Sequence, residues 1–157
     1  TRLAKLAAGE ADATLLARAG LNRLDAAGTG HPLAADEWLP APGQGAIAIE
    51  CRADDAATRA VLAAIDHEPS RHAVFAERAL LAGLGGNCHS PIAVLTSADG
   101  ADLILRAAIY SPDGAEKIEA TQRFAAGDPA GPARLAAELL NRAPESVRVH
   151  FSGPERS

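Results

Sequence analysis

The feature that most constrains the fold of this chain is a pair of alternating segments joined by a turn. In residues 101–110, and again in residues 116–124, apolar side chains recur at alternate positions. A period of two is typical of a strand that buries one face. The sequence SPDG at residues 111–114 lies between them and has proline at the second position of a turn. The pattern predicts an antiparallel hairpin, and the apolar residues 92–96 supply a third strand.

Two segments with helical spacing flank these strands and are predicted to pack on the sheet. The first covers residues 69–81 and ends in a glycine-rich stretch. The second begins with aspartate and proline at residues 128–129, and its leucines recur at helical spacing. The alternating Val147, Val149 and Phe151 are predicted to add a short terminal strand. This part of the chain is therefore predicted to be a self-contained α+β unit.

The earlier part of the chain has the pattern of shorter α/β pieces. Residues 1–8 and the segment that runs to Ile65 have helical spacing, and Asp54 and Asp55 are both candidates for the N-cap of the second helix. Residues 13–17 and 46–51 are apolar runs typical of short buried strands. The Pro/Gly-rich residues 40–45 are typical of a connector between domains. These pieces predict α/β layers that are incomplete in themselves.

Composition excludes several classes of function. Aromatic residues make up only 3% of the chain against 48% hydrophobic residues, so Ala, Leu, Ile and Val must build the core. The net charge of -5 and the absence of a basic run argue against nucleic-acid binding. No apolar stretch is long enough to cross a membrane. Two cysteines without metal-ligand spacing predict a reduced, cytoplasmic protein without a metal site. Because the chain opens at Thr1 in a helical register, we expect it to be part of something longer.

Cys88 lies in a loop, GLGGNCHSP at residues 83–91, between a predicted helix and a predicted strand. Glycines let this backbone turn freely, and a sulfur in such a loop can meet a small molecule. The setting suits a nucleophile or a point of covalent attachment, and it is equally compatible with a free thiol of no function. Cys51 ends an apolar run and is predicted to be packed as a small hydrophobic side chain.

Three further residues are candidates for binding an anion. Arg2 and Arg23 lie near the ends of helical segments in the predicted α/β layers, where ligands often bind, and a guanidinium donates two parallel hydrogen bonds to a carboxylate. Gln44, between two glycines, can offer its amide and exposed backbone N–H groups. The alternatives are solvated helix surface for the arginines and a simple hinge for Gln44.

Four stretches of the chain, taken together, resemble the porphobilinogen deaminase (hydroxymethylbilane synthase) family. The resemblance follows the order of the sequence and extends over essentially the whole chain. The stretches are TRLAKL at residues 1–6, LLARAGLNRL at 15–24, LPAPGQGAIAIECR at 39–52, and GGNCHSPIA at 85–93 after the helical AERAL at 76–80.

The resemblance implies a three-domain fold whose first two domains are α/β lobes like those of periplasmic binding proteins. Residues 1–40 would end domain 2, residues 41–67 would cross back and add a strand and a helix to domain 1, and residues 68–157 would form an α+β domain 3. The chain would then be roughly the C-terminal half of an enzyme that is monomeric at full length, and its N-terminal half would be a missing partner.

The resemblance also implies an activity. Enzymes of this family are transferases of tetrapyrrole (haem) biosynthesis that join four porphobilinogen units into hydroxymethylbilane and release ammonia. The chain is built on a dipyrromethane cofactor, which a thioether would attach to Cys88. Arg2 and Arg23 match arginines that bind pyrrole carboxylates, and Gln44 matches a position lining the cleft. The catalytic aspartate belongs to the missing half, so no catalytic residue is expected here and the fragment alone is predicted to be inactive.

The loop departs from the family pattern at two positions. Asn87 stands where the family usually has glycine, and His89 stands where glutamine is common. Neither removes the cysteine, but both can change the conformation of the loop and the surroundings of the sulfur. Two other functions stay open at this point: a non-enzymatic module that binds anions through arginines, and a thiol enzyme that uses Cys88 as a transient nucleophile with His89 nearby.

Overall fold

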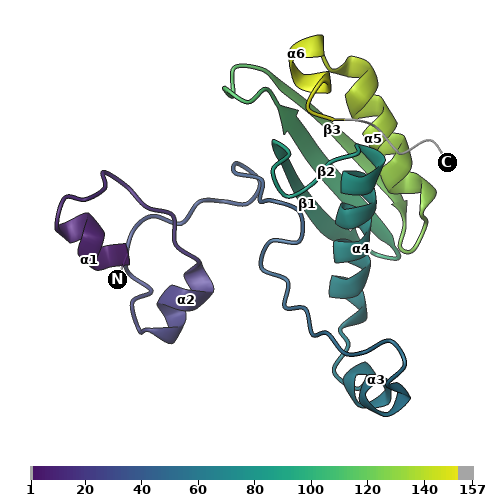
Figure 1. The fold of residues 1–157 in the computed structure, drawn as a ribbon, viewed down its shortest axis with the longest axis horizontal. Coiled ribbons are helices and arrows are strands. Elements are labelled where there is room, and N and C mark those ends of the chain that lie inside the picture. Colours follow the sequence, from purple (N-terminus) through teal and green to yellow (C-terminus); the bar gives the residue numbers. More distant parts are fainter. Residues whose placement is uncertain (1, 152–157) are drawn as a thin grey trace. The chain divides into compact units, whose positions relative to one another are not determined.

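The computed structural model describes residues 2–151, which form two compact units that divide between Ala34 and Ala35. Each unit is described by itself. The first contains the short helices α1 (Arg2–Ala7) and α2 (Arg18–Arg23). The second contains α3 (Ala56–Ala63), α4 (Glu68–Gly83), β1 (Ile92–Asp99), β2 (Asp102–Tyr110), β3 (Lys117–Ala125), α5 (Ala130–Arg142) and α6 (Glu145–Arg148) (Figure 1). Every helix within the described residues is too short or too polar to cross a bilayer.

The three predicted strands form an antiparallel sheet in the order β1-β2-β3. Ala107 in the central strand pairs with Val94 on one side and with Ala120 on the other. The predicted turn closes the second hairpin, because the amide of Gly114 donates to the carbonyl of Ser111 at 2.9 Å. The sequence prediction of a three-stranded antiparallel sheet and of an α+β unit is confirmed.

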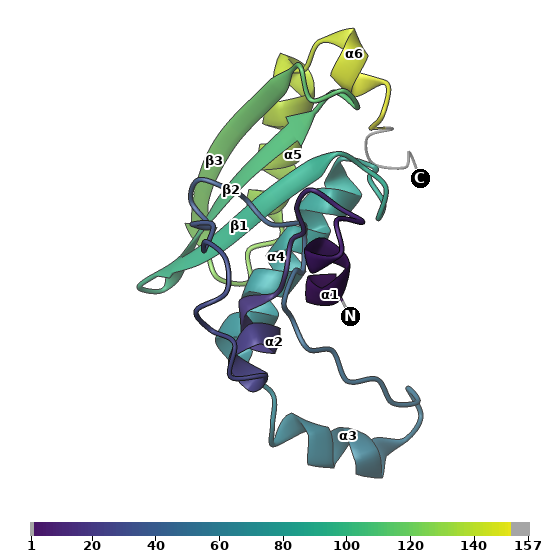
Figure 2. The same cartoon turned by 90° about the vertical axis from the view of Figure 1, so that its left-hand side faces the viewer.

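One face of the sheet carries the core, and α4 and α5 pack on it (Figure 2). The alternating residues of β2 that were predicted to share a face all belong to this core. Burying such apolar side chains is the main source of stability in a domain of this size. The fully buried large side chains are Leu80, Leu84, Val94, Leu105, Ile109, Pro132, Leu135, Leu139 and Val147.

The opposite face of the sheet is partly covered by residues 36–43, which we call the strap. Leu39 is only 8% exposed and packs with Ala93 and Ala108. The carbonyl of Pro40 accepts a hydrogen bond of 2.7 Å from the amide of Val94 in β1. At the start of the strap, Arg106 donates to the carbonyl of Asp36 at 2.6 Å. The strap is therefore an integral layer of the second unit.

The predicted terminal strand is wrong. Residues 145–148 form the helix α6, and Val147 and Phe151 are buried against the core while Val149 is exposed. Val147 and Phe151 are four residues apart, which places both on one side of a helical turn, and that spacing competes with the period of two that the valines suggested. The helical arrangement wins because it closes the end of the core.

The two predicted short strands are also not formed: residues 13–17 and 46–51 lie outside any strand that the structure describes. Leu15, Ile47 and Ile49 are exposed, and Ile47 is 92% exposed. A strand is stable only when a neighbour satisfies its backbone N–H and C=O groups, and no strand of residues 2–151 lies beside either segment. The apolar composition was recognised correctly, but the partner that would make it a strand is not among these residues.

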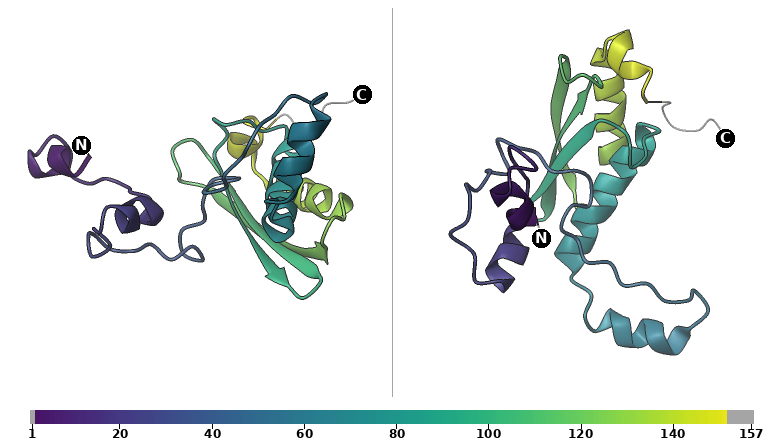
Figure 3. Two further views of the ribbon diagram at one scale, coloured as in Figure 1. Left: turned by 90° about the horizontal axis from the view of Figure 1, so that it is seen from below. Right: turned by 60° about the vertical axis from the view of Figure 1, so that its left-hand side comes forward.

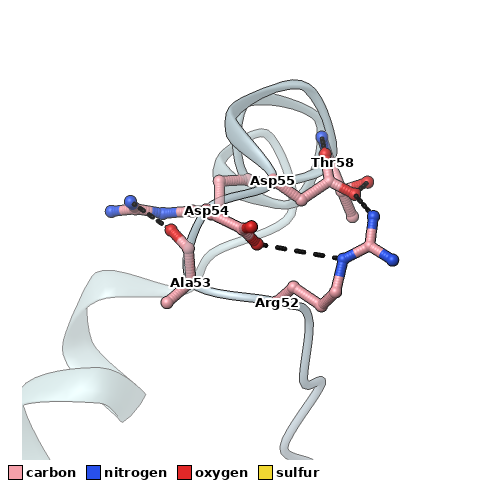
Figure 4. Close-up of polar contacts among 6 residues, drawn as sticks. Arg52, Ala53, Asp54, Asp55 and Thr58 are labelled. Atoms are coloured by element: carbon pink, nitrogen blue, oxygen red, sulfur yellow. Dashed lines mark hydrogen bonds and ion pairs between the residues drawn. The ribbon is translucent and has the colours of Figure 1, made fainter.

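The start of α3 agrees with one of the two N-cap candidates that the sequence offered. Asp55 is the N-cap, and its carboxylate accepts hydrogen bonds from the amide and the hydroxyl of Thr58 at 3.0 and 2.8 Å. These bonds hold the pKa of Asp55 below its ordinary value. Arg52 makes ion pairs with Asp54 and Asp55, at N–O distances of 3.8 and 3.6 Å. Figure 4 shows how these side chains lie at the start of the helix. The helix is thus fixed by local bonds, while its apolar Val61 and Ile65 stay exposed.

Asp113 gives the β2–β3 turn a dependence on pH. Its carboxylate accepts from the hydroxyl of Ser111 at 2.5 Å and from the amide of Ala115 at 3.1 Å, and these bonds hold the pKa of Asp113 below its ordinary value. A depressed folded-state pKa means that the stabilisation is complete above the unfolded pKa and is lost as the pH falls through the folded pKa. We expect the free energy of unfolding, measured in urea, to decrease as the pH is lowered below about 4. This decrease should be smaller in Asp113→Asn than in the protein without the substitution. Equal slopes in the two proteins would contradict this role.

Candidate functional site

The loop that carries Cys88 begins where α4 ends. The amide of Gly85 donates to the carbonyl of Ala82 and the amide of Gly86 to that of Leu81, both at 2.9 Å. Gly85 has a φ of +66°, a conformation that L side chains rarely adopt and that commonly ends a helix. The glycines therefore turn the chain sharply out of α4 towards the cysteine.

A hydrogen-bonded turn then presents Cys88. The amide of Ser90 donates to the carbonyl of Asn87 at 3.0 Å, so Cys88 and His89 are the two central residues of the turn. The side chains close it further: the amide of Asn87 donates to the hydroxyl of Ser90 at 2.9 Å, and the amide of His89 donates to Oδ1 of Asn87 at 2.8 Å. Asn87, the departure from the family pattern, thus supplies a bond that glycine could not make.

Cys88 is an exposed, free thiol at the corner of this turn. Within residues 2–151 the sulfur forms neither a disulfide nor a hydrogen bond. A thiol placed in this way is accessible to an electrophile and is held on a backbone of fixed conformation. The loop position predicted from the sequence is thus exposed, and covalent attachment at this sulfur stays a prediction.

A cavity of about 370 Å³ lies beside the turn. His89 and His150 are among its lining residues, and Cys88 is not. The remaining lining residues are Asn87, Ser90, Pro91 and Pro112. His89, the departure from the family pattern that follows the cysteine, therefore contributes to the wall of this cavity.

Ser90 is a residue of the site that sequence reasoning missed. Its hydroxyl is the acceptor for the Asn87 amide, so Ser90→Ala removes one bond of the turn. We expect the amides of Asn87 and His89 to exchange with solvent roughly three- to tenfold faster in Ser90→Ala. Ser97→Ala, at an exposed position of β1, is the matched control and should leave both rates unchanged. Hydrogen exchange followed by NMR measures this, and equal rates in Ser90→Ala and the unmodified protein would contradict the assignment.

Arg2 and Arg23 lie in the first unit, on α1 and α2. Both side chains are exposed, and neither makes an ion pair with another of residues 2–151. Arg2 donates to the carbonyl of Leu15 at 3.3 Å, which ties α1 to the segment before α2. Figure 3 shows these two short helices. Both guanidiniums belong to the first unit, whereas Cys88 belongs to the second, and a role in binding a carboxylate stays a prediction.

Gln44 lies in the second unit, at the end of the strap, on two consecutive turns. The amide of Gln44 donates to the carbonyl of Ala41, and the amide of Ala46 donates to that of Gly43, at 3.0 and 3.1 Å. Gly43 and Gly45 have φ values of +69° and +82°, as the third position of such turns requires. We call residues 41–46 the double turn. The side chain of Gln44 at its centre is exposed.

The prediction for Cys51 is wrong: it is exposed and unpaired. It was assigned to the core because the apolar run 46–51 was expected to be a buried strand, and that strand is not formed. Among residues 2–151 no group of three or more His, Cys, Asp or Glu side chains could hold a metal ion.

Two family models match the chain. Residues 1–60 match "Porphobilinogen deaminase, dipyromethane cofactor binding domain", and residues 72–142 match "Porphobilinogen deaminase, C-terminal domain". The chain belongs to the porphobilinogen deaminase family. The first match contains Arg2, Arg23 and Gln44, and the second match contains Cys88.

Relatives named porphobilinogen deaminase match nearly all of this chain. One from Sphingopyxis alaskensis is 55% identical over 154 residues, which are 97% of this chain and 48% of the relative. One from Nitrobacter hamburgensis is 47% identical over 98% of this chain and 49% of the relative, and one from Paracoccus denitrificans is 50% identical over 92% and 47%. The chain therefore spans about half the length of the curated relatives it matches.

Proposed function

We propose that this chain is part of an enzyme with porphobilinogen deaminase activity and that Cys88 attaches its dipyrromethane cofactor. The observation that carries the proposal is the free, exposed thiol at the corner of a hydrogen-bonded turn, in a chain that belongs to this family. The substrate would be porphobilinogen, and the reaction would be the polymerising transfer, with release of ammonia, that the family name implies.

The residues of the chain fit this cofactor. An accessible thiol without a hydrogen-bond partner among residues 2–151 is the group that a thioether requires. When bound, the dipyrromethane would supply the primer to which pyrrole units are added. Its carboxylates need fixed cations, and Arg2 and Arg23 offer exposed guanidiniums that make no competing ion pair among the described residues. Gln44 would add an amide from the double turn.

We also propose which domains of the full-length enzyme the segments of this chain belong to. Residues 1–40 and 41–67 would complete two periplasmic-binding-protein-like α/β lobes, and residues 68–157 would form the third domain. Support comes from the apolar Leu15, Ile47 and Ile49, which are exposed here and would be buried once their segments pair with strands of the other half. The catalytic aspartate would belong to that half. A monomeric full-length enzyme and a cytoplasmic location stay predictions.

The test is turnover by the intact protein that contains this chain. We expect it to consume porphobilinogen and to release ammonia, while the chain of residues 1–157 alone does neither. Colour formation with a reagent specific for free-α-position pyrroles follows the substrate. Binding of porphobilinogen by the folded intact protein without ammonia release would contradict the proposal and favour an anion-binding module. Turnover with Cys88 fully titratable as a free thiol would favour a thiol enzyme.

A further inference from the structure

We infer that Glu77 is a positioning residue that holds the double turn, and with it Gln44, against the part of the fold that carries Cys88. The functional part of this inference rests on the proposed function, in which Gln44 lines the cleft. The structural part stands on the contacts of the Glu77 carboxylate alone.

Both oxygens of the Glu77 carboxylate are used, and each binds a different element. Oε2 accepts a hydrogen bond of 2.7 Å from the backbone amide of Gly43, which is 34 residues away in the sequence. Oε1 accepts a hydrogen bond of 2.9 Å from the hydroxyl of Thr96 in β1. Glu77 itself belongs to α4 and is half-buried. A hydrogen bond to an ionised carboxylate is stronger than one between neutral groups, so this clamp joins three separate segments firmly.

The contacts of Glu77 with Gly43 and Thr96, which we call the clamp, are made at the C-terminal end of the strap. Earlier in the strap, Leu39 is buried and the carbonyl of Pro40 is bound by Val94. Beyond the double turn the chain no longer packs on the unit, as the nearly complete exposure of Ile47 indicates. Of the hydrogen bonds within residues 2–151, the one that the Gly43 amide donates to Glu77 ties the double turn to the helices and strands.

The two elements joined by Glu77 are also the two that flank the Cys88 loop. α4 precedes the loop and β1 follows it, so the turn that presents Cys88 connects these two elements. Glu77 lies on α4 and its partner Thr96 lies on β1. Gln44 and Cys88 are therefore fixed to one rigid frame, and the clamp converts a Pro/Gly connector into a defined part of the binding site.

The structural arm of the test measures hydrogen exchange at the Gly43 amide in the intact protein. We expect exchange in Glu77→Ala to be roughly ten- to a hundredfold faster, because a hydrogen bond to a charged group is lost. Glu77→Gln should stay close to the unmodified protein, because its amide can accept from Gly43 and donate to Thr96. Glu138→Ala on α5, which removes a surface ion pair with Arg142, is the matched control and should have no effect. Unchanged exchange in Glu77→Ala, or equally fast exchange in Glu77→Gln, would overturn the clamp.

A second variant keeps the test decisive if Glu77→Ala does not fold. Thr96→Val removes only the hydroxyl that holds Oε1 and preserves the shape and the strand propensity of the residue. We expect a smaller increase of Gly43 exchange in the same direction. Exchange equal to that of the unmodified protein would count against the clamp.

The functional arm measures steady-state turnover of porphobilinogen. If Gln44 helps to bind substrate carboxylates, Glu77→Ala should raise KM by roughly three- to tenfold while kcat changes less, and Glu77→Gln should restore KM. A Glu77→Ala protein with fast Gly43 exchange but unchanged KM and kcat would overturn the functional role. If the unmodified intact protein has no turnover at all, it is the proposed function that fails, and the exchange measurement still decides the clamp.

Discussion

Cys88→Ala in the intact protein is expected to lower the rate of porphobilinogen consumption by roughly a thousandfold or more. The physical reason is that alanine cannot form a thioether, and no other sulfur lies on the turn at residues 87–90. Cys88→Ser keeps the size of the side chain, but a hydroxyl is a far weaker nucleophile than a thiolate, so it should be nearly as inactive. Initial rates with a circular dichroism spectrum of each variant measure the effect.

Cys51→Ala is the matched control, because Cys51 is also exposed and free but lies in an irregular segment outside the turn. It should retain the activity of the unmodified protein. Cys88→Ala with full turnover would contradict the account, and so would a loss of activity confined to Cys51→Ala. Either result would mean that the residue needed for turnover lies outside the Cys88 loop of the α+β unit.

Gly131→Ala is expected to destabilise the α+β unit by about 3 kcal/mol. Gly131 lies buried in the first turn of α5, and a Cβ added there would lie 2.2 Å from Cγ of Phe124, whose ring is buried on β3. Real atoms do not approach so closely, and a rigid aromatic ring cannot move aside as a flexible side chain can. Either α5 must shift from the sheet or the ring must leave its rotamer, and both disturb the main core.

Two other glycines provide a graded control. A Cβ at Gly83 would meet Cβ of Ala136 at 3.0 Å, so Gly83→Ala should cost less than Gly131→Ala. At Gly28 no atom lies within 4 Å and φ is not positive, so Gly28→Ala should be nearly neutral. Urea unfolding of the intact protein and its variants gives the free energies. A Gly131→Ala protein as stable as Gly28→Ala would show that α5 does not pack on Phe124 as described.

The elements that could be predicted from sequence are those whose pattern and partner are both local. The alternation in residues 101–110 and 116–124 predicts the hairpin because the turn at 111–114 brings its own partner strand. Asp54 and Asp55 predict the start of α3 to within one residue, because an N-cap bonds to an amide three residues away, and Asp55 is the residue that makes this bond. Residues 13–17 have the composition of a strand, but none of the strands described between residues 2 and 151 pairs with them, and composition alone does not supply a partner.

The strap and its clamp could not be predicted because their contacts are distant in sequence. Nothing near Leu39 indicates that it packs on Ala93 and Ala108, and the bond from Gly43 to Glu77 crosses 34 residues. A Pro/Gly-rich segment has the same composition whether it is a free hinge or a fixed turn. For the double turn, the hydrogen bond from the Gly43 amide to Glu77, a half-buried carboxylate on α4, distinguishes the two.

The candidate site was predicted unevenly for a similar reason. The exposure of Cys88 follows from its glycine-flanked loop, and Asn87 and Ser90, spaced three apart around it, are residues that commonly bond to their own turns. Their reciprocal bonds were not predicted, because side chains of this kind can bond in several directions. Arg2 and Arg23 were connected with Cys88 only through the family resemblance, and they lie in the other compact unit.

The intact mass of the purified full-length protein tests the central claim most directly. If Cys88 is the anchor of the cofactor, the protein without substitutions should carry a covalent adduct with the mass of a dipyrromethane. Peptide mapping should place this adduct on Cys88. Cys51→Ala should retain the adduct, and Cys88→Ala should lack it. An active protein whose mass equals that of its unmodified sequence, with both thiols titratable, would contradict the account.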